Sequence, residues 1–317
     1  MFWAWREFKK GKLKKQDIAG FGFDIEEEIF RLHKELSNFS YKHDDYTHFV
    51  ICDPKRRDVH KASPRDRLLH HAVYKVLWPL FDKEFIYDSF SSRKNKGMHK
   101  AHERFAQFAW RLSRNKTSIV WVLKCDIRKF FDSIDHSILI NILKKRLDKN
   151  TISLAKEIIQ SFKKDSGKGI PIGNLTSQLF SNIYLNEFDQ FVKRKLQVKH
   201  YIRYADDFVI LSSDKNYLSK LVPLLSDFLE VRLALSIHPR KIIIRKWHQG
   251  IDFLGYIIFP HYKILRTKTK KRILKKLDKL HKKLVQGKIS NFPFSQSRQS
   301  YLGILKHCRG HSIEDLL

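Results

Sequence analysis

The chain has 317 residues, 42% hydrophobic and 13% aromatic, so it is long enough to bury a substantial core. Its 63 Lys and Arg exceed its 33 Asp and Glu by 30 formal charges. Self-repulsion of this size predicts an anionic partner. Nucleic acid is the commonest, because counterions released from its phosphates drive binding. The aromatic content excludes a disordered basic tail, and no apolar run is long enough for a transmembrane helix.

The cysteines point to a reducing compartment. Cys52, Cys125 and Cys308 lack CxxC spacing, which excludes a readable disulfide framework or zinc knuckle. The N-terminal MFWAWREFKKGKLKK has neither a long apolar core nor a small-residue cleavage site, so it does not resemble a signal peptide. We therefore expect a cytoplasmic protein.

Helical spacing of apolar residues predicts helices over 25–36, 177–196 and 218–229. Ser63-Pro64-Arg65-Asp66 is typical of a helix start, with Ser as the N-cap and Pro at the first helical position. We expect Pro79 to kink or end this helix, and its buried stripe to comprise Leu69, Ala72, Val73, Val76, Leu77 and Leu80.

A second pattern concerns charge near the C-terminus. Residues 261–288 carry twelve Lys or Arg against Asp278 alone, with an apolar seam at helical spacing. A charge run is usually a solvated face. Here the global cationic excess favours contact with a phosphate backbone.

Carboxylates in apolar surroundings carry the chemistry. A strand over 118–124 delivers Asp126 at its end, and a hairpin formed by 200–204 and 208–211 carries Asp206 and Asp207 at its tip. Each feature alone is typical of an ordinary turn. Together, three such carboxylates need a cation, and can hold two Mg²⁺ ions about 3.5–4 Å apart. This predicts phosphoryl or nucleotidyl transfer.

These motifs occur together in a known family. Tyr204-Ala205-Asp206-Asp207 resembles the YXDD box of reverse transcriptases, and residues 126–131 resemble the family's first catalytic motif. The resemblance covers roughly residues 60–310, and its other matches follow the family's order: Ser92-Arg93-Lys94, Gly173 to Gln178, Pro239-Arg240-Lys241 and Phe253-Leu254-Gly255-Tyr256.

The resemblance implies an α+β, right-hand polymerase fold. Residues 1–60 would be an N-terminal extension packing on the fingers, and residues 61–118 the fingers. Residues 119–258 would form the palm, whose antiparallel sheet carries the YADD hairpin, with a fingers insertion at about 150–175. Residues 259–317 would form a helical thumb.

The family also implies residue roles. Asp126, Asp206 and Asp207 would be catalytic, with Lys241 protonating the pyrophosphate leaving group. Two Mg²⁺ ions would be held by Asp126, Ile127, Asp206 and Asp207. The dNTP would contact Arg93, Lys94, Ile127, Phe131, Ile172, Gly173 and Gln178, with Phe131 as the steric gate that excludes a 2′-hydroxyl. Nucleic acid would contact Tyr204, Gly255, Lys268, Lys271, Arg272 and Lys275.

One departure narrows the lineage. Ile172 stands where most reverse transcriptases have Gln, and Gln178 where they have Pro. This IGxxxSQ form resembles the enzymes of diversity-generating retroelements, found in bacteria and phages. They copy a template-repeat RNA with errors opposite adenine, for mutagenic retrohoming. The resemblance implies a structured template RNA, a cDNA/RNA hybrid and a small basic accessory protein oligomer as partners.

Three alternatives remain open at this stage. The chain could be a faithful reverse transcriptase of another bacterial lineage, either intron maturase-like or defence-associated. It could instead be a non-catalytic RNA-binding scaffold, because its charge favours RNA affinity regardless of chemistry. A membrane-surface protein is disfavoured, because the cationic face of residues 261–288 lacks an aromatic wedge.

Overall fold

The computed structural model describes residues 1–52 and 56–310, so residues 311–317 of the predicted thumb lie outside the described residues. The chain forms two compact units. The first comprises Met1–Gly97, Cys125–Val209 and Lys220–Ile242, and the second Met98–Lys124, Ile210–Ser219 and Ile243–Leu317. Strands β3 and β5 each pass from one unit into the other.

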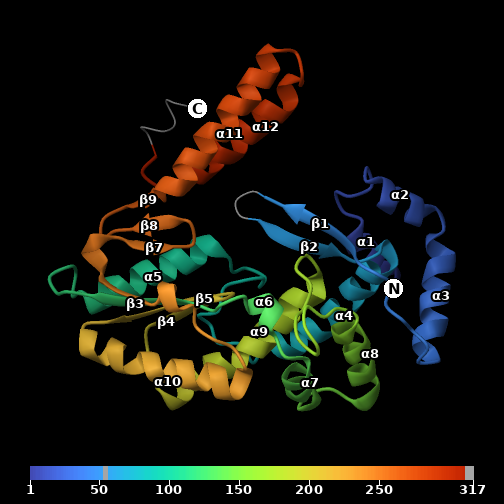
Figure 1. Cartoon of the computed structure of the whole chain (residues 1–317), viewed down its shortest axis with the longest axis horizontal. Helices are drawn as coiled ribbons and strands as arrows, with labels where there is room; N and C mark the ends of the chain where they lie inside the picture. The colour runs from blue at the N-terminus through green and yellow to red at the C-terminus, as the bar shows by residue number, and fades with distance from the viewer. Residues whose placement is uncertain (53–55, 311–317) are drawn as a thin grey trace. The chain divides into compact units, whose positions relative to one another are not determined.

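The first unit begins with three short helices and a hairpin that surround a long helix (Figure 1). Both α1 and α2 pack on α4, and Ser63 caps α4 by accepting from the Asp66 N–H at 3.1 Å. The predicted 25–36 helix and the Ser63 cap are thus confirmed. The elements are α1 (Phe2–Phe8), α2 (Gln16–Phe23), α3 (Ile25–Ser37), β1 (Thr47–Ile51), β2 (Arg57–Lys61) and α4 (Pro64–Asp82).

The buried stripe of α4 differs from the prediction. Val76 is 60% and Leu80 52% exposed, whereas Leu68 and Phe81 are buried. Helix α4 contacts α1, α2 and α9, so neighbours on more than one side select its buried positions, and one apolar stripe does not describe it. The helix also continues through Pro79 to Asp82.

The rest of the first unit contains the predicted YADD hairpin and the helices around it. Asp135 caps α7, and the predicted 177–196 helix is α9 continued by a π-helical turn, η1. The predicted hairpin is β4–β5. The elements are α6 (Phe130–Ser133), α7 (His136–Lys144), α8 (Lys149–Gln160), α9 (Leu175–Gln190), η1 (Phe191–Lys195), β4 (Tyr201–Tyr204), β5 (Asp207–Ser212), α10 (Lys215–Leu233) and η2 (Pro239–Lys241).

The second unit has its own small core. Apolar side chains of β8, β9, α11 and α12 pack together around Tyr256, Ile273 and Tyr301, and α11 and α12 lie side by side (Figure 1). The amphipathic helix expected within 261–288 is α11, and Ile273 and Leu277 of its seam are buried. The elements are α5 (Met98–Leu112), β6 (Ile243–Lys246), η3 (Trp247–Gln249), β7 (Ile251–Phe253), β8 (Tyr256–Ile258), β9 (Lys263–Leu265), α11 (Thr267–Val285) and α12 (Asn291–Leu305).

A four-stranded sheet has the order β4-β5-β3-β6, where β3 spans Trp121–Asp126. Strand β3 starts three residues later than predicted but ends, as expected, at Asp126. It pairs antiparallel with β6, with Trp121 opposite Lys246 and Lys124 opposite Ile243. The separate sheet β7-β8-β9 is antiparallel throughout. Among the described residues, no helix is both long and apolar enough to cross a membrane.

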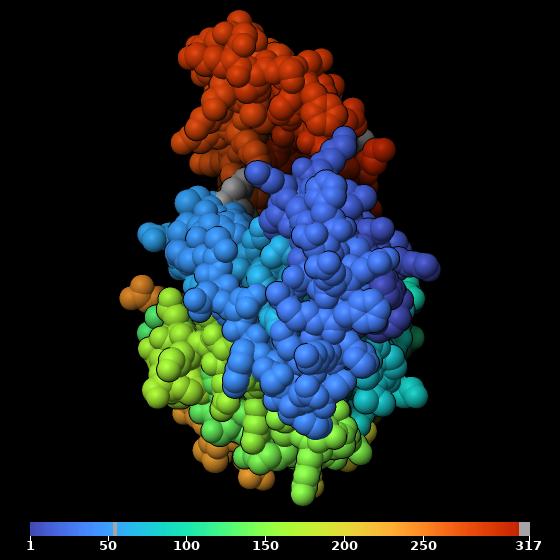
Figure 2. Space-filling model, turned by 90° about the vertical axis from the view of Figure 1, so that its right-hand side faces the viewer, coloured from blue at the N-terminus to red at the C-terminus, as the bar shows by residue number. Residues whose placement is uncertain are grey.

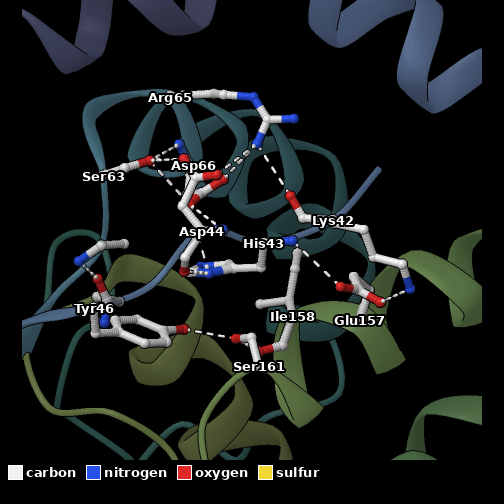
Figure 3. A network of polar contacts seen from close by, with 12 residues as sticks. Lys42, His43, Asp44, Tyr46, Ser63, Arg65, Asp66, Glu157, Ile158 and Ser161 are labelled. Carbon is white, nitrogen blue, oxygen red and sulfur yellow. Dashed lines mark hydrogen bonds and ion pairs between the residues drawn. The ribbon is translucent and has the colours of Figure 1, made fainter. Parts of the chain in front are cut away.

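A polar network ties the segment after α3 to α4 and α8 (Figure 3). The buried Asp66 accepts from the Tyr41 hydroxyl at 2.8 Å and from the Asp44 N–H at 3.0 Å. On α8, Glu157 accepts from Lys42 Nζ at 3.1 Å. Because the residues of this network come from three chain segments, the network fixes the N-terminal helices to the unit. Figure 2 shows these helices, in blue, on the face turned to the viewer.

The Tyr41→Phe variant tests this network. The change removes a hydrogen bond to a buried carboxylate, so we expect the free energy of unfolding to fall by about 1–2 kcal/mol. Urea denaturation followed by circular dichroism measures it. Tyr217→Phe, in a side chain 38% exposed, is the control and should change little; equal effects in both variants would contradict the assignment.

Candidate active site

Main-chain hydrogen bonds join three segments: the end of β3, the β4–β5 turn and the residues before η2. The Ile127 N–H donates to the Asp206 carbonyl at 3.1 Å, and the His238 N–H donates to the Asp126 carbonyl at 2.8 Å. Ile127 and Ile237 also form an isolated antiparallel bridge. The fold therefore brings two predicted catalytic segments, eighty residues apart, to one place.

The β4–β5 turn is very short. Strand β4 ends at Tyr204 and β5 begins at Asp207, which leaves Ala205 and Asp206 as the connection. Ala205 has φ +52°, a left-handed conformation that side-chain-bearing residues rarely adopt. A strained residue at such a turn persists only when its surroundings fix it.

A buried ion pair helps to hold Ala205 in this conformation. The Arg203 guanidinium is fully buried and donates to the two carboxylate oxygens of Asp189 at 2.7 and 2.6 Å. It also donates to the Ala205 carbonyl at 3.2 Å and to Ser89 Oγ at 3.1 Å. Tyr201 completes the cluster by donating to Asp189 at 2.7 Å. The turn that carries the two aspartates is thus anchored to α9 from inside the unit.

The carboxylates at the turn repel one another. Burial, reinforced by the negative charges of Asp207 and Asp126, raises the pKa of Asp206 to about 6. A lysine offsets part of this charge, because Lys241 Nζ lies 2.5 Å from Asp126 Oδ1. The predicted catalytic residues Asp126, Asp206, Asp207 and Lys241 therefore influence one another electrostatically.

The chemistry of this donor set fits divalent cations, because oxygen ligands with excess negative charge are what Mg²⁺ prefers. Within residues 1–52 and 56–310, however, no three Asp, Glu, His or Cys side chains are grouped closely enough to hold an ion as they stand. The oxygen of Asp126 accepts from Lys241 instead. The predicted metal ligands, including Ile127, whose side chain is buried, remain a prediction.

Two predicted dNTP-contacting segments are also neighbours. Phe131, half-buried in α6, accepts at its carbonyl from the Ile170 N–H at 2.9 Å. Farther along, the Ile172 carbonyl accepts from the His60 N–H of β2 at 3.2 Å, and Asn174 Nδ2 donates to the His60 carbonyl at 2.9 Å. These bonds hold the start of the IGxxxSQ segment between α6 and β2.

Gly173 and Gln178 occupy different environments in that segment. Gly173 has φ +113°, and a Cβ there would lie 2.9 Å from a methyl carbon of Val59. Only glycine fits this backbone without displacing β2. Gln178 is exposed on the first turn of α9.

Arg93 lies in an unexpected environment. Its side chain is only 7% exposed, and it donates to the Asp82 carboxylate at 2.8 Å and to the Ile86 carbonyl at 2.7 Å. These contacts hold the loop after α4, and a triphosphate would have to compete with them. Lys94 is exposed, and Tyr204 is half-buried, which raises its pKa.

The predicted nucleic-acid residues of the second unit lie on two elements. Gly255, with φ +89°, connects β7 and β8, and its carbonyl accepts from the Arg266 N–H at 3.2 Å. Lys268, Lys271 and Lys275 are exposed on α11, and Arg272 is half-buried there. The exposed lysines form a cationic face opposite the apolar seam.

Comparison with known proteins identifies the family. Residues 51–258 match the family model described as reverse transcriptase (RNA-dependent DNA polymerase). The chain belongs to this family. This reverse transcriptase domain includes the β3 end, the IGxxxSQ segment, the YADD hairpin and η2.

Curated relatives are distant and longer. The chain is 27% identical to protein YkfC of Escherichia coli (strain K12), over 64% of this chain and 63% of that protein. It is 23% identical to the group II intron-encoded protein LtrA of Lactococcus lactis subsp. cremoris, over 86% and 55%. It is 22% identical to the putative COX1/OXI3 intron 2 protein of Saccharomyces cerevisiae, over 78% and 36%. The chain thus spans about one to two thirds of these relatives.

Solved structures support the same fold. Telomerase from Candida tropicalis, in complex with a fragment of telomeric RNA, matches with a TM-score of 0.56 at 14% identity, over 84% of this chain and 53% of that one. Telomerase from Candida albicans matches with a TM-score of 0.54 at 12% identity, over 74% and 49%. This likeness shows the fold alone, and the predicted α+β, right-hand polymerase class is confirmed.

Arg203 and Asp189 were not among the residues predicted to matter at the site. Both occur within predicted regular structure, where a charged residue ordinarily faces solvent. The available signal was Arg203 in the apolar run Tyr201 to Tyr204, and Asp189 next to Phe188 on the predicted 177–196 helix. Two opposite charges in buried elements indicate a pair.

The raised pKa of Asp206 predicts a specific pH dependence. Its value of about 6 in the folded chain exceeds the ordinary 3.8, so the folded state binds this proton more tightly than the unfolded state. This contribution to stability is complete below about pH 4 and is lost by about pH 6, with a size near 3 kcal/mol. In Asp206→Asn, this loss of stability between about pH 4 and pH 6 should be absent.

Urea denaturation of the metal-free chain at pH 4.5 and 7.5 measures the difference. Relative to the unmodified chain, Asp206→Asn should be stabilised more at pH 7.5 than at pH 4.5. The exposed Asp227 provides the control Asp227→Asn. Equal pH dependence for Asp206→Asn and the unmodified chain would show that Asp206 titrates normally.

Proposed function

We propose that the chain is an RNA-directed DNA polymerase that copies an RNA template into cDNA by two-metal nucleotidyl transfer. The carrying observation is the convergence of Asp126, Asp206 and Asp207 at a turn anchored from within the unit. Membership of the reverse transcriptase family supports it. We place the activity in the cytoplasm of a bacterial cell, encoded by a chromosome or phage.

Asp126, Asp206 and Asp207, with Ile127 beside them, would hold two Mg²⁺ ions. When bound, these ions would activate the primer hydroxyl and neutralise the triphosphate. The carboxylates hold negative charge in a partly buried site, where cation binding also lowers their mutual repulsion. Lys241, which is paired with Asp126, would donate a proton to the pyrophosphate leaving group.

Phe131 would select the sugar. Its ring packs edge-on against the buried Phe130, at 5.3 Å between ring centroids, so a neighbouring side chain supports the ring on one side. A bulky ring at this position excludes a 2′-hydroxyl by steric overlap, which favours dNTP over rNTP. Lys94, Gly173 and Gln178 would contact the same nucleotide, and Arg93 would join them on leaving Asp82.

Within the family, we assign the chain to the diversity-generating retroelements. The support is Ile172, which is half-buried on a segment held by β2. An apolar side chain there offers shape but no hydrogen bond to the incoming nucleotide, so mispairs meet less discrimination. On this assignment the template is a template-repeat RNA, copied with errors at adenine for mutagenic retrohoming, and a small basic accessory protein oligomer takes part.

Two alternative functions make different predictions. Several relatives are named as intron proteins, which favours a faithful enzyme of a maturase-like lineage. A non-catalytic scaffold would bind RNA through the net charge of +30 without synthesising DNA. Fidelity and carboxylate dependence separate the three.

Primer extension on a heteropolymeric RNA template, with Mg²⁺ and dNTPs, tests the proposal. The reactions are run with and without the accessory protein, and the products are sequenced. We expect errors concentrated opposite template adenines, and fewer of them in Ile172→Gln. Asp206→Ala/Asp207→Ala should lose at least about 10³-fold in rate while retaining RNA binding.

Each alternative has its own signature in the same assay. Faithful copying of adenine would keep the polymerase and reject the retroelement assignment. Absence of DNA under every condition, with RNA binding intact, would reject the polymerase.

A further inference from the structure

A cavity in the first unit lies among α7, α9, η1 and α10. Its volume is about 740 Å³, within the range typical of small-molecule sites. The predicted catalytic and nucleotide-contacting residues do not line it. The walls comprise Ile138, Asn141, Ile142, Lys145, Glu187, Gln190, Phe191, Arg194, Lys195, Phe228, Arg232 and Leu233.

An aromatic pair forms part of the wall. The rings of Phe191 and Phe228 stack with centroids 4.1 Å apart and planes 12° apart, and both are half-buried. Phe191 opens η1, a π-helical turn that widens the helix at this point. Such turns are rare and frequently occur at functional sites. The two rings cover each other's inner faces, so the pair gives the cavity an aromatic wall made of the remaining ring surface.

Cations surround the aromatic pair. Arg194, Lys195 and Arg232 are exposed, and none of them makes an ion pair with another described residue. Lys145 differs, since Glu187 accepts from its Nζ at 3.1 Å. The positive side chains at the cavity therefore outnumber the negative one, which favours a ligand carrying a phosphate.

The cavity wall also holds an unsatisfied acceptor. Gln190 donates through Nε2 to the Glu84 carbonyl at 2.8 Å and to Asn186 at 3.1 Å. Its Oε1 atom is shielded from water and has no hydrogen-bond donor among the described residues. An unpaired buried acceptor is unfavourable, and a ligand N–H would reach this atom once the Gln190 amide turns toward the cavity.

We propose that this cavity binds a nucleotide, with the base against the Phe191–Phe228 pair and the phosphate on Arg194, Lys195 and Arg232. Aromatic stacking combined with cationic contacts is how proteins hold single-stranded nucleotides. The nucleotide is either free or an unpaired residue of a bound RNA, because paired bases keep their faces stacked. The site is separate from the polymerase chemistry and does not depend on it.

Photocrosslinking to the purified full-length chain tests the proposal and distinguishes the two sources. One probe is 8-azidoadenosine 5′-monophosphate. A second is an RNA hairpin with one bulged 8-azidoadenosine, and the third is the same hairpin with that residue paired. We expect the first or second probe to label peptides containing Phe191 or Phe228, with the paired hairpin labelling them far less.

Two matched variants control for charge. Arg194→Ala/Arg232→Ala should lower labelling of these peptides about tenfold, whereas Lys149→Ala/Lys220→Ala, also at exposed positions, should not. Both should keep the circular dichroism of the unmodified chain and its primer extension on an unstructured template. Equal losses in both variants, equal labelling by the paired hairpin, or crosslinks only elsewhere would overturn the site.

Discussion

The Arg203–Asp189 ion pair is the interaction on which the arrangement of the catalytic turn depends. Removing one member of such a buried pair leaves an uncompensated charge, at a cost of about 3–5 kcal/mol. The same guanidinium binds the Ala205 carbonyl, so the pair joins α9 to the strained turn between β4 and β5. Its energy therefore does more than stabilise the unit, because it fixes where Asp206 and Asp207 stand.

At this site, main-chain hydrogen bonds hold together carboxylates that repel one another. Main-chain bonds hold Asp126 and Asp206 together, although burial and like charges raise the pKa of Asp206. Lys241 offsets part of the negative charge through its ion pair with Asp126. Such a site is poised for cations, because every bound positive charge would lower the repulsion that the fold imposes. The main-chain hydrogen bonds hold the carboxylates together, and their mutual repulsion favours a bound cation.

Much of this could be predicted from sequence, and the exceptions have physical causes. The YADD hairpin, the Asp126 strand end and the Ser63 cap were predictable because each depends on local periodicity or turn chemistry. The burial of α4 was not, because its neighbours come from distant segments. Arg93 was predicted to face substrate, but its contacts with Asp82 arise from the tertiary path of the loop. Arg203 and Asp189, fourteen residues apart, stand out in the sequence as charges among apolar residues, but the bond from Arg203 to the Ala205 carbonyl arises only in the folded chain.

The most direct measurement is primer extension by Asp189→Asn, with circular dichroism and primer–template affinity recorded on the same preparation. Loss of the Asp189 charge frees Arg203 from its partner and releases the Ala205 turn. The account predicts a fall in kcat of at least about tenfold at temperatures where the variant is folded, with primer–template affinity unchanged. Full activity in the folded variant would contradict it, since the catalytic turn would then hold its position without the pair.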